Sequence, residues 1–230
     1  MIGLSLIIPN HNGAKVMGES IAKYYQAFTK KFKNLELIVV CNHCTDNSMQ
    51  ICNKLMKKFP LKVIEISQKG KGYALVRGFN EANFENIGFL DVDNPFELER
   101  ISKMIENLEK YDVVIASKYL RGQAKIQDSF LRRFFSLGGG IFSRFFFKLN
   151  FRDTQAGAKF FKKRVWEKID KDFICLGFDF DIEFLYKVHN AKFKILEYYM
   201  PLVKYEKFST VSAKYLLGMV FRLLKLRFLK

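Results

Sequence analysis

The chain has 230 residues, a length that suits one α/β domain and is sufficient to bury a full core. Hydrophobic residues make up 49% of the sequence, which excludes a disordered chain, and the formal net charge of +16 predicts an anionic partner: nucleic acid, a membrane surface or a phosphorylated substrate. Met1 opens directly into an apolar run, and no uncharged apolar stretch of about 20 residues occurs, so we expect neither a signal peptide nor a transmembrane helix. The cysteines are expected to be reduced thiols of a cytoplasmic protein; they are Cys41, Cys44, Cys52 and Cys175.

Apolar runs alternate with amphipathic helical patterns along the first half of the chain. We expect strands at 3–9, 35–41, 62–66, 87–91 and 112–117, and helices at 20–30, 48–59, 70–82 and 97–108. Because each strand is a continuous run of Val, Ile and Leu, the pattern predicts an α/β fold with a mostly parallel sheet and helices on both faces. Ligands of such sheets bind beyond the carboxyl ends of the strands, so the residues at these ends are expected to line one crevice. These residues are Pro9, Asn42, Gly70 and Asp91.

Two carboxylates one residue apart, Asp91 and Asp93, follow the fourth predicted strand. Strand residues alternate faces, so both carboxylates are expected to point the same way from the end of the strand. Two hard oxygen ligands at this spacing suit Mg²⁺ or Mn²⁺, with phosphate oxygens completing the coordination shell. The alternative is a polar turn that caps the next helix.

Other polar residues at this edge suit the remaining parts of a nucleotide. Lys71 lies between two glycines at an expected helix start, where its ammonium and free backbone N–H groups would contact a phosphate; a plain turn is the alternative. Asn42 follows the second strand and would hydrogen-bond the edge of a nucleobase, since an amide both donates and accepts. Cys41, His43 and Cys44 do not predict a zinc site, because no second pair of ligands follows at a suitable spacing.

Several of these segments resemble the GT-A glycosyltransferases of family 2 in order and spacing. They are Ile7-Ile-Pro-Asn-His-Asn-Gly13, Glu36-Leu-Ile-Val-Val-Cys-Asn-His-Cys-Thr-Asp-Asn-Ser48, Gly70-Lys-Gly-Tyr-Ala-Leu75 and Phe89-Leu-Asp-Val-Asp93. Later segments at 116–119, 153–160 and 177–184 look most like the branch that makes dolichyl-phosphate mannose or dolichyl-phosphate glucose. Family members usually carry an Asp pair where this chain has Cys41-Asn42, and Gly13 replaces a frequent Glu, so the identity of the nucleotide stays open.

The resemblance implies a GT-A fold, a Rossmann-like sheet that binds a nucleoside-diphosphate sugar with Mg²⁺ or Mn²⁺. The implied metal ligands are Asp91 and Asp93. The implied donor-binding residues are Pro9, Asn12, Asn42, Lys71, Asp91, Val92, Asp93, Ser136 and Lys159.

Two segments combine basic and apolar residues. Segment 129–150 is rich in Phe and Leu and has no acidic residue, so we expect it to lie in the membrane interface; a buried helical hairpin with snorkelling arginines is the alternative. Arg132 and Ser136 are four residues apart, on one helical face. Together with Lys118, they match positions that resemble the acceptor-phosphate site of dolichyl-phosphate mannose synthases. Segment 211–230 repeats the composition and is expected to be a membrane anchor; a calmodulin-type target helix or a nucleic-acid arm is the alternative.

We expect one domain over 1–230, with a nucleotide-sugar half at 1–117, an acceptor half at 118–206 and a basic amphipathic helix at 207–230. Its predicted activity is inverting transfer of a sugar from a nucleoside-diphosphate sugar to a polyprenyl (dolichyl-type) phosphate, on the cytosolic face of a membrane. An ionised phosphate needs orientation and charge neutralisation rather than a strong base. The residues predicted to take part in catalysis are Asp93, Asp181, Arg132 and Lys118.

Two other functions remain as alternatives. Transfer to a saccharide hydroxyl would need a carboxylate base, for which Asp181 is the first candidate and Asp153 the second; Asp181 also fits ordinary stabilisation of a helix N-terminus. A basic nucleic-acid-binding protein is disfavoured, because the Phe residues follow helical stripes rather than an exposed sheet. A membrane-anchoring partner or a homo-oligomer is left open.

Overall fold

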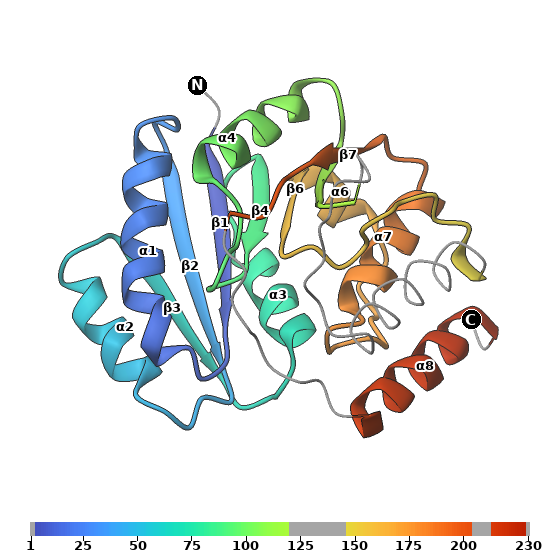
Figure 1. Cartoon of the computed structure of the whole chain (residues 1–230), viewed down its shortest axis with the longest axis horizontal. Coiled ribbons are helices and arrows are strands. Elements are labelled where there is room, and N and C mark those ends of the chain that lie inside the picture. Colours follow the sequence, from blue (N-terminus) through green and yellow to red (C-terminus); the bar gives the residue numbers. More distant parts are fainter. Residues whose placement is uncertain (1–2, 120–145, 204–212, 229–230) are drawn as a thin grey trace.

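The computed structural model describes residues 3–119, 146–203 and 213–228. Within these ranges, one sheet of seven strands has the order β3-β2-β1-β4-β6-β5-β7 (Figure 1). The strands are β1 (Leu4–Asn10), β2 (Leu35–Asn42), β3 (Leu61–Ile66), β4 (Asn86–Leu90), β5 (Val113–Ser117), β6 (Ala158–Lys162) and β7 (Ile195–Tyr199). The helices are α1 (Ala14–Thr29), α2 (Ser48–Met56), α3 (Lys71–Asn80), α4 (Leu98–Glu106), α6 (Lys163–Lys168), α7 (Phe180–Asn190) and α8 (Ala213–Phe228), and η1 (Asn107–Glu109) is a short 3₁₀ helix.

All of these strands except β6 run in the same direction. Strands β1, β2, β3 and β4 pair in parallel, as do β5 and β7, whereas β6 is antiparallel to both β4 and β5. The register pairs Asn10 with Cys41 and Leu90 with Ala158. The carboxyl ends of the parallel strands therefore meet the amino end of β6 at one edge, and the predicted mostly parallel α/β sheet is confirmed.

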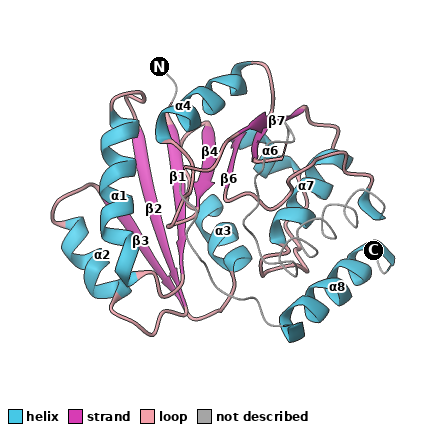
Figure 2. Cartoon of the chain, in the orientation of Figure 1, coloured by secondary structure: helices cyan, strands magenta, loops and turns pink. Residues whose placement is uncertain are grey.

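The two faces of the sheet carry separate hydrophobic clusters, because strand side chains alternate. In β1, Ile7 faces one cluster while Leu6 and Ile8 face the other. Helices α3, α6 and α7 pack on the first face, and α1, α2 and α4 pack on the second (Figure 2). The high Phe content is used in the first cluster, where Phe79 contacts Phe161 edge-on with ring centroids 5.0 Å apart. Such pairs contribute about 0.5–1.5 kcal/mol beyond the area they bury.

Helix α1 begins at Ala14, six residues before the predicted start. The Asp46 carboxylate, from the loop after β2, accepts a hydrogen bond of 3.0 Å from the Ala14 N–H. In the same loops, Asn12 Oδ1 accepts from the backbone N–H of Thr45 at 2.7 Å. A helix start stabilised by a distant loop leaves no local capping pattern in the sequence, which explains the difference.

Most of segment 129–150, including Arg132 and Ser136, lies outside the described residues. At its described end Phe147 and Leu149 are buried in the first cluster, whereas Lys148 and Asn150 are exposed. These two apolar side chains therefore contact the protein rather than a membrane, and the expectation for the rest of the segment stays a prediction. Among the described helices, none is both long and apolar enough to cross a membrane.

Candidate active site

The site begins at the turn that follows β4. The strand ends at Leu90, and a turn closes with a hydrogen bond of 3.0 Å from the Asn94 N–H to the Asp91 carbonyl. Asp91 and Asp93 therefore lie in a turn, and the expectation that strand alternation orients both carboxylates is wrong. The Tyr24 hydroxyl donates to the same Asp91 carbonyl at 2.7 Å, so helix α1 also supports the turn. Burial raises the pKa of Tyr24, which keeps this hydroxyl protonated as a donor.

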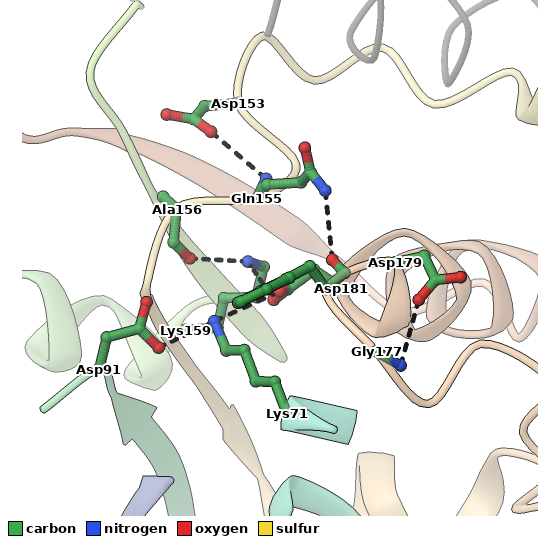
Figure 3. A network of polar contacts seen from close by, with 10 residues as sticks. Lys71, Asp91, Asp153, Gln155, Ala156, Lys159, Gly177, Asp179 and Asp181 are labelled. Atoms are coloured by element: carbon green, nitrogen blue, oxygen red, sulfur yellow. Dashed lines mark hydrogen bonds and ion pairs between the residues drawn. The ribbon is translucent and has the colours of Figure 1, made fainter. Parts of the chain in front are cut away.

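Four charged side chains of alternating sign form a continuous network at this turn (Figure 3). The Lys71 ammonium lies 2.8 Å from Asp91 Oδ1 and 3.4 Å from Asp181 Oδ2. The Lys159 ammonium donates to Asp181 Oδ1 at 2.6 Å and to the Ala156 carbonyl at 2.8 Å. Side-chain exposure is 9% for Lys71, 2% for Asp181 and 0% for Lys159. The network therefore links α3, the β4 turn, β6 and α7, and only its Asp91 end, with a side chain that is 33% exposed, reaches solvent.

Burial and the neighbouring charges act against each other on the two lysines. For Lys159, burial is the larger effect and lowers the pKa, although the Asp181 carboxylate opposes it. Burial acts on Lys71 in the same direction, but Asp181 and Asp91 together outweigh it and the pKa is raised. Lys71 is thus held as a cation between two carboxylates.

Glycines allow the backbones around this network to approach closely. A Cβ at Gly157 would lie 2.1 Å from Asp91 Oδ2, so a side chain there would displace the carboxylate. Gly70 has a φ of +148°, and a Cβ at Gly72 would lie 2.7 Å from the Leu176 Cα atom. The Gly72 N–H donates to the Leu176 carbonyl at 3.0 Å, so this amide is not free for a phosphate as expected. Gly70 and Gly72 therefore allow the backbone of Leu176 to pack closely against the start of α3, and they do not form a plain turn.

The loops after β1 and β2 lie at the same edge of the sheet and contact each other. The His11 ring contacts the Asn42 carbonyl at 2.8 Å, and the His11 and His43 rings are nearly parallel with centroids 6.3 Å apart. Asn42 is buried at the end of β2, and Pro9 is buried within β1 opposite Val40. Pro9 therefore supports the sheet edge and does not present an exposed surface to a ligand.

The predicted residues do not all come together. Lys71, Asp91, Asp181 and Lys159 share one network, whereas the Lys118 ammonium lies over the Tyr119 ring, 5.1 Å from its centroid. The sequence did not single out Tyr24 or Gly157. Gly157 precedes β6 and carries no local signal of its contact, because Asp91 is 66 positions away in the sequence.

Asp153 lies near Lys159 of the charged network and is also buried. Its carboxylate accepts backbone hydrogen bonds from Lys118 at 3.4 Å and from Gln155 at 3.3 Å. Burial raises the pKa of Asp153, and the charges of Lys118 and Lys159 oppose this effect. Asp153 therefore retains a stronger tendency to hold a proton than an exposed carboxylate.

The carboxylates at this site fit a divalent metal whose other ligands are phosphate oxygens and water. Within the described ranges, no group of three or more His, Cys, Asp and Glu side chains is arranged to hold a metal ion. Asp91 and Asp93 offer hard carboxylate oxygens, and Mg²⁺ commonly takes one or two carboxylates together with phosphate oxygens and water. The donor set thus suits a metal bound to a diphosphate.

A mostly parallel α/β sheet with a charged turn at its carboxyl edge is the arrangement expected of a GT-A glycosyltransferase. The family model "Glycosyl transferase family 2" matches residues 5–182, and the chain belongs to this family. It is 29% identical over 193 residues to the dolichol-phosphate mannosyltransferase of Pyrococcus furiosus, covering 82% of this chain and 54% of that protein. It is 26% identical over 218 residues to the dolichyl-phosphate beta-glucosyltransferase of Saccharomyces cerevisiae, covering 85% of this chain and 65% of that protein.

The chain thus spans between about half and two thirds of the length of these relatives. Among solved structures, it resembles glucosyl-3-phosphoglycerate synthase from Mycobacterium tuberculosis in complex with Mn²⁺, UDP and phosphoglyceric acid. The TM-score is 0.68 with 16% identity, over 98% of this chain and 78% of that one. This likeness shows the fold, and the predicted GT-A fold and family are confirmed.

Proposed function

We propose that this glycosyltransferase moves a sugar, with inversion, from a nucleoside-diphosphate sugar to a polyprenyl phosphate at the cytosolic face of a membrane. The observation that carries the proposal is the network of Lys71, Asp91, Asp181 and Lys159 at the carboxyl edge of the sheet, in which Asp91 is partly exposed and the other three side chains are buried. The names of the relatives, a dolichol-phosphate mannosyltransferase and a dolichyl-phosphate glucosyltransferase, support this class of acceptor.

On the donor side, Asp91 and Asp93 would hold Mg²⁺ or Mn²⁺ on the diphosphate. The metal would neutralise charge on the leaving diphosphate. Lys71 lies beside Asp91 and supplies a further positive charge at this point. The Tyr24 hydrogen bond and the close contact with Gly157 keep the Asp91 turn in one position, as preorganised catalysis requires.

On the acceptor side, the state of Asp181 favours a phosphate over a hydroxyl. Both of its oxygens are already in contact with ammonium groups, one from Lys159 and one from Lys71. A carboxylate engaged in this way is poorly placed to remove a proton from a hydroxyl. An ionised phosphate needs no such base. Asp181 then orients the two lysines.

One observation favours the second candidate function, transfer to a saccharide hydroxyl. Burial raises the pKa of Asp153, which is what a general base near neutral pH requires. The two functions share the donor and the fold, and they differ in whether Asp153 removes a proton.

Membrane attachment is assigned to α8. Leu217, Phe221 and Phe228 are exposed by 73%, 70% and 69%, while Leu223 and Leu226 of the same helix are buried against the protein. A helix that packs by one side and exposes a second apolar side with basic residues suits the interface of a membrane. The exposed basic residues are Lys225 and Arg227.

The proposal is tested with radiolabelled GDP- and UDP-sugars and two matched acceptors, polyprenyl phosphate and the corresponding polyprenol. We expect label to enter the lipid phase only with the phosphate, and Asp93→Asn to lower turnover by at least about a hundredfold, because metal-ion charge stabilisation is worth several kcal/mol. Asp172→Asn, at an exposed carboxylate, serves as the control and should be neutral. Equal labelling of polyprenol, or activity that survives both Asp93→Asn and chelation, would contradict the proposal.

A further inference from the structure

The Lys71 ammonium lies next to Asp91, one of the two carboxylates that would hold a divalent metal. It lies 2.8 Å from Asp91 Oδ1, and its side chain is only 9% exposed. The other oxygen, Asp91 Oδ2, faces Gly157, where even a Cβ would be only 2.1 Å away. The Asp91 side chain is 33% exposed, and a cation that approaches it finds one oxygen paired with Lys71 and the other beside the Gly157 backbone.

The charges of the network already balance without a metal. Asp91 and Asp181 contribute two negative charges, and Lys71 and Lys159 contribute two positive charges. A carboxylate that is already paired with an ammonium gains less from a second cation, which must also lose part of its own hydration. Mg²⁺ in particular dehydrates reluctantly. The balance changes only when a group with further negative charge enters.

We propose that Lys71 is an internal counter-cation of Asp91, which has to leave this carboxylate before a divalent metal binds. Metal binding is then coupled to the arrival of the nucleotide diphosphate, whose phosphate oxygens receive the displaced ammonium. The flexible stem of lysine allows this change of partner, since the ammonium is a point charge on four methylene groups. The inference rests on the proposed donor site and adds the order in which its parts assemble.

The test measures Mn²⁺ binding without nucleotide, by electron paramagnetic resonance of free Mn²⁺. Wild type is compared with Lys71→Met and with the control Lys69→Met, which removes an exposed lysine two residues away and changes the net charge equally. We expect Lys71→Met to bind Mn²⁺ at least about tenfold more tightly than the control, since a lost competing ion pair is worth ~1.4 kcal/mol or more. Adding Asp91→Asn to Lys71→Met should remove the gain.

A second variant covers a failure of Lys71→Met to fold. The amide of Lys71→Gln keeps a hydrogen bond to Asp91 without the charge, and it should also bind Mn²⁺ more tightly than Lys69→Met. If the folded variant binds Mn²⁺ no better than the control, Lys71 does not exclude the metal and the inference is wrong. The readout contains no sugar donor or acceptor, so it is independent of the transfer assay that tests the proposed function.

Discussion

Lys159 is fully buried, and specific partners offset the free-energy cost of removing its ammonium from water. Its ammonium lies 2.6 Å from Asp181 and 2.8 Å from the Ala156 carbonyl, and it also lies over the Phe89 ring, 5.4 Å from the centroid. Burial lowers the pKa of Lys159, because the charged ammonium is unfavourable away from water unless a carboxylate pairs with it. The pairing with Asp181 is therefore a structural as well as a functional feature.

Replacing Lys159 should destabilise the protein strongly. Lys159→Met removes the closer partner of buried Asp181, and breaking a buried ion pair costs about 3–5 kcal/mol in the free energy of unfolding. Urea denaturation measures this loss. Lys162→Met is the control on the same strand, because its ammonium is 4.0 Å from Asp112 and its side chain is 27% exposed. A similar loss in both variants would show that the Asp181 contact is not what stabilises β6.

Lys118 and Asp153 distinguish the two acceptors. With a phosphate acceptor, Lys118→Ala should lower kcat/KM by roughly ten- to a hundredfold, because a charge-assisted hydrogen bond is worth about 1.5–3 kcal/mol. Arg132→Ala should act in the same direction, and Asp153→Asn should cost less than either. Lys118→Arg should keep most activity, since it retains the charge. The reverse order, with Asp153→Asn nearly inactive and Lys118→Ala mild, would favour a hydroxyl acceptor.

At the scale of elements, the sequence was sufficient for β1 to β5 and insufficient for β6 and β7. Strands β1, β4 and β5 are buried along their whole length and β2 along most of it, and such apolar runs are a strong local signal; β3, with the sequence Leu-Lys-Val-Ile-Glu-Ile, is a half-buried edge strand. Strand β6 has the sequence Ala-Lys-Phe-Phe-Lys and places Lys159 in the interior, where an isolated lysine is not expected. Its position between β4 and β5 depends on tertiary pairing alone.

The site shows the same division between local and tertiary information. Lys71 and Asp91 were each predicted at the carboxyl edge of the sheet, because each follows a strand. Their contact with each other, and with Asp181 from the second half, was not predicted, because a buried pairing over 110 positions leaves no periodic pattern. The expected phosphate contact of the Gly72 N–H fails for the same reason, because Leu176, which is distant in the sequence, packs on Gly72 and accepts its hydrogen bond.

An ion pair joins helix α8 to the start of α7, beside the packing of Leu223 and Leu226. Arg222 Nε donates to Asp179 Oδ2 at 2.6 Å, and Asp179 is fully buried at the start of α7. Arg222→Ala should lower the free energy of unfolding by about 1–3 kcal/mol, since a buried acceptor loses its cation. Limited proteolysis should also cleave α8 faster. Arg227→Ala, at an exposed position of the same helix, is the control and should change neither measurement.

For the whole molecule, charge and exposed apolar surface act together in the proposed attachment to a membrane. The formal net charge of +16 attracts an anionic surface, and each basic residue close to it contributes about 1 kcal/mol. The apolar side of α8 adds a contribution that salt does not screen, since it depends on the burial of Leu217, Phe221 and Phe228. High salt should therefore weaken attachment without abolishing it.

Flotation with liposomes tests both contributions. The protein should float with anionic vesicles and less with neutral ones, and Phe221→Ser should reduce the fraction that remains bound at high salt. This substitution should leave the unfolding free energy nearly unchanged, because the side chain is 70% exposed. Met56→Ser, at an exposed apolar residue of α2, is the matched control. Equal flotation with neutral and anionic vesicles would exclude the electrostatic contribution, and equal effects of the two substitutions would exclude α8 as the surface that contacts lipid.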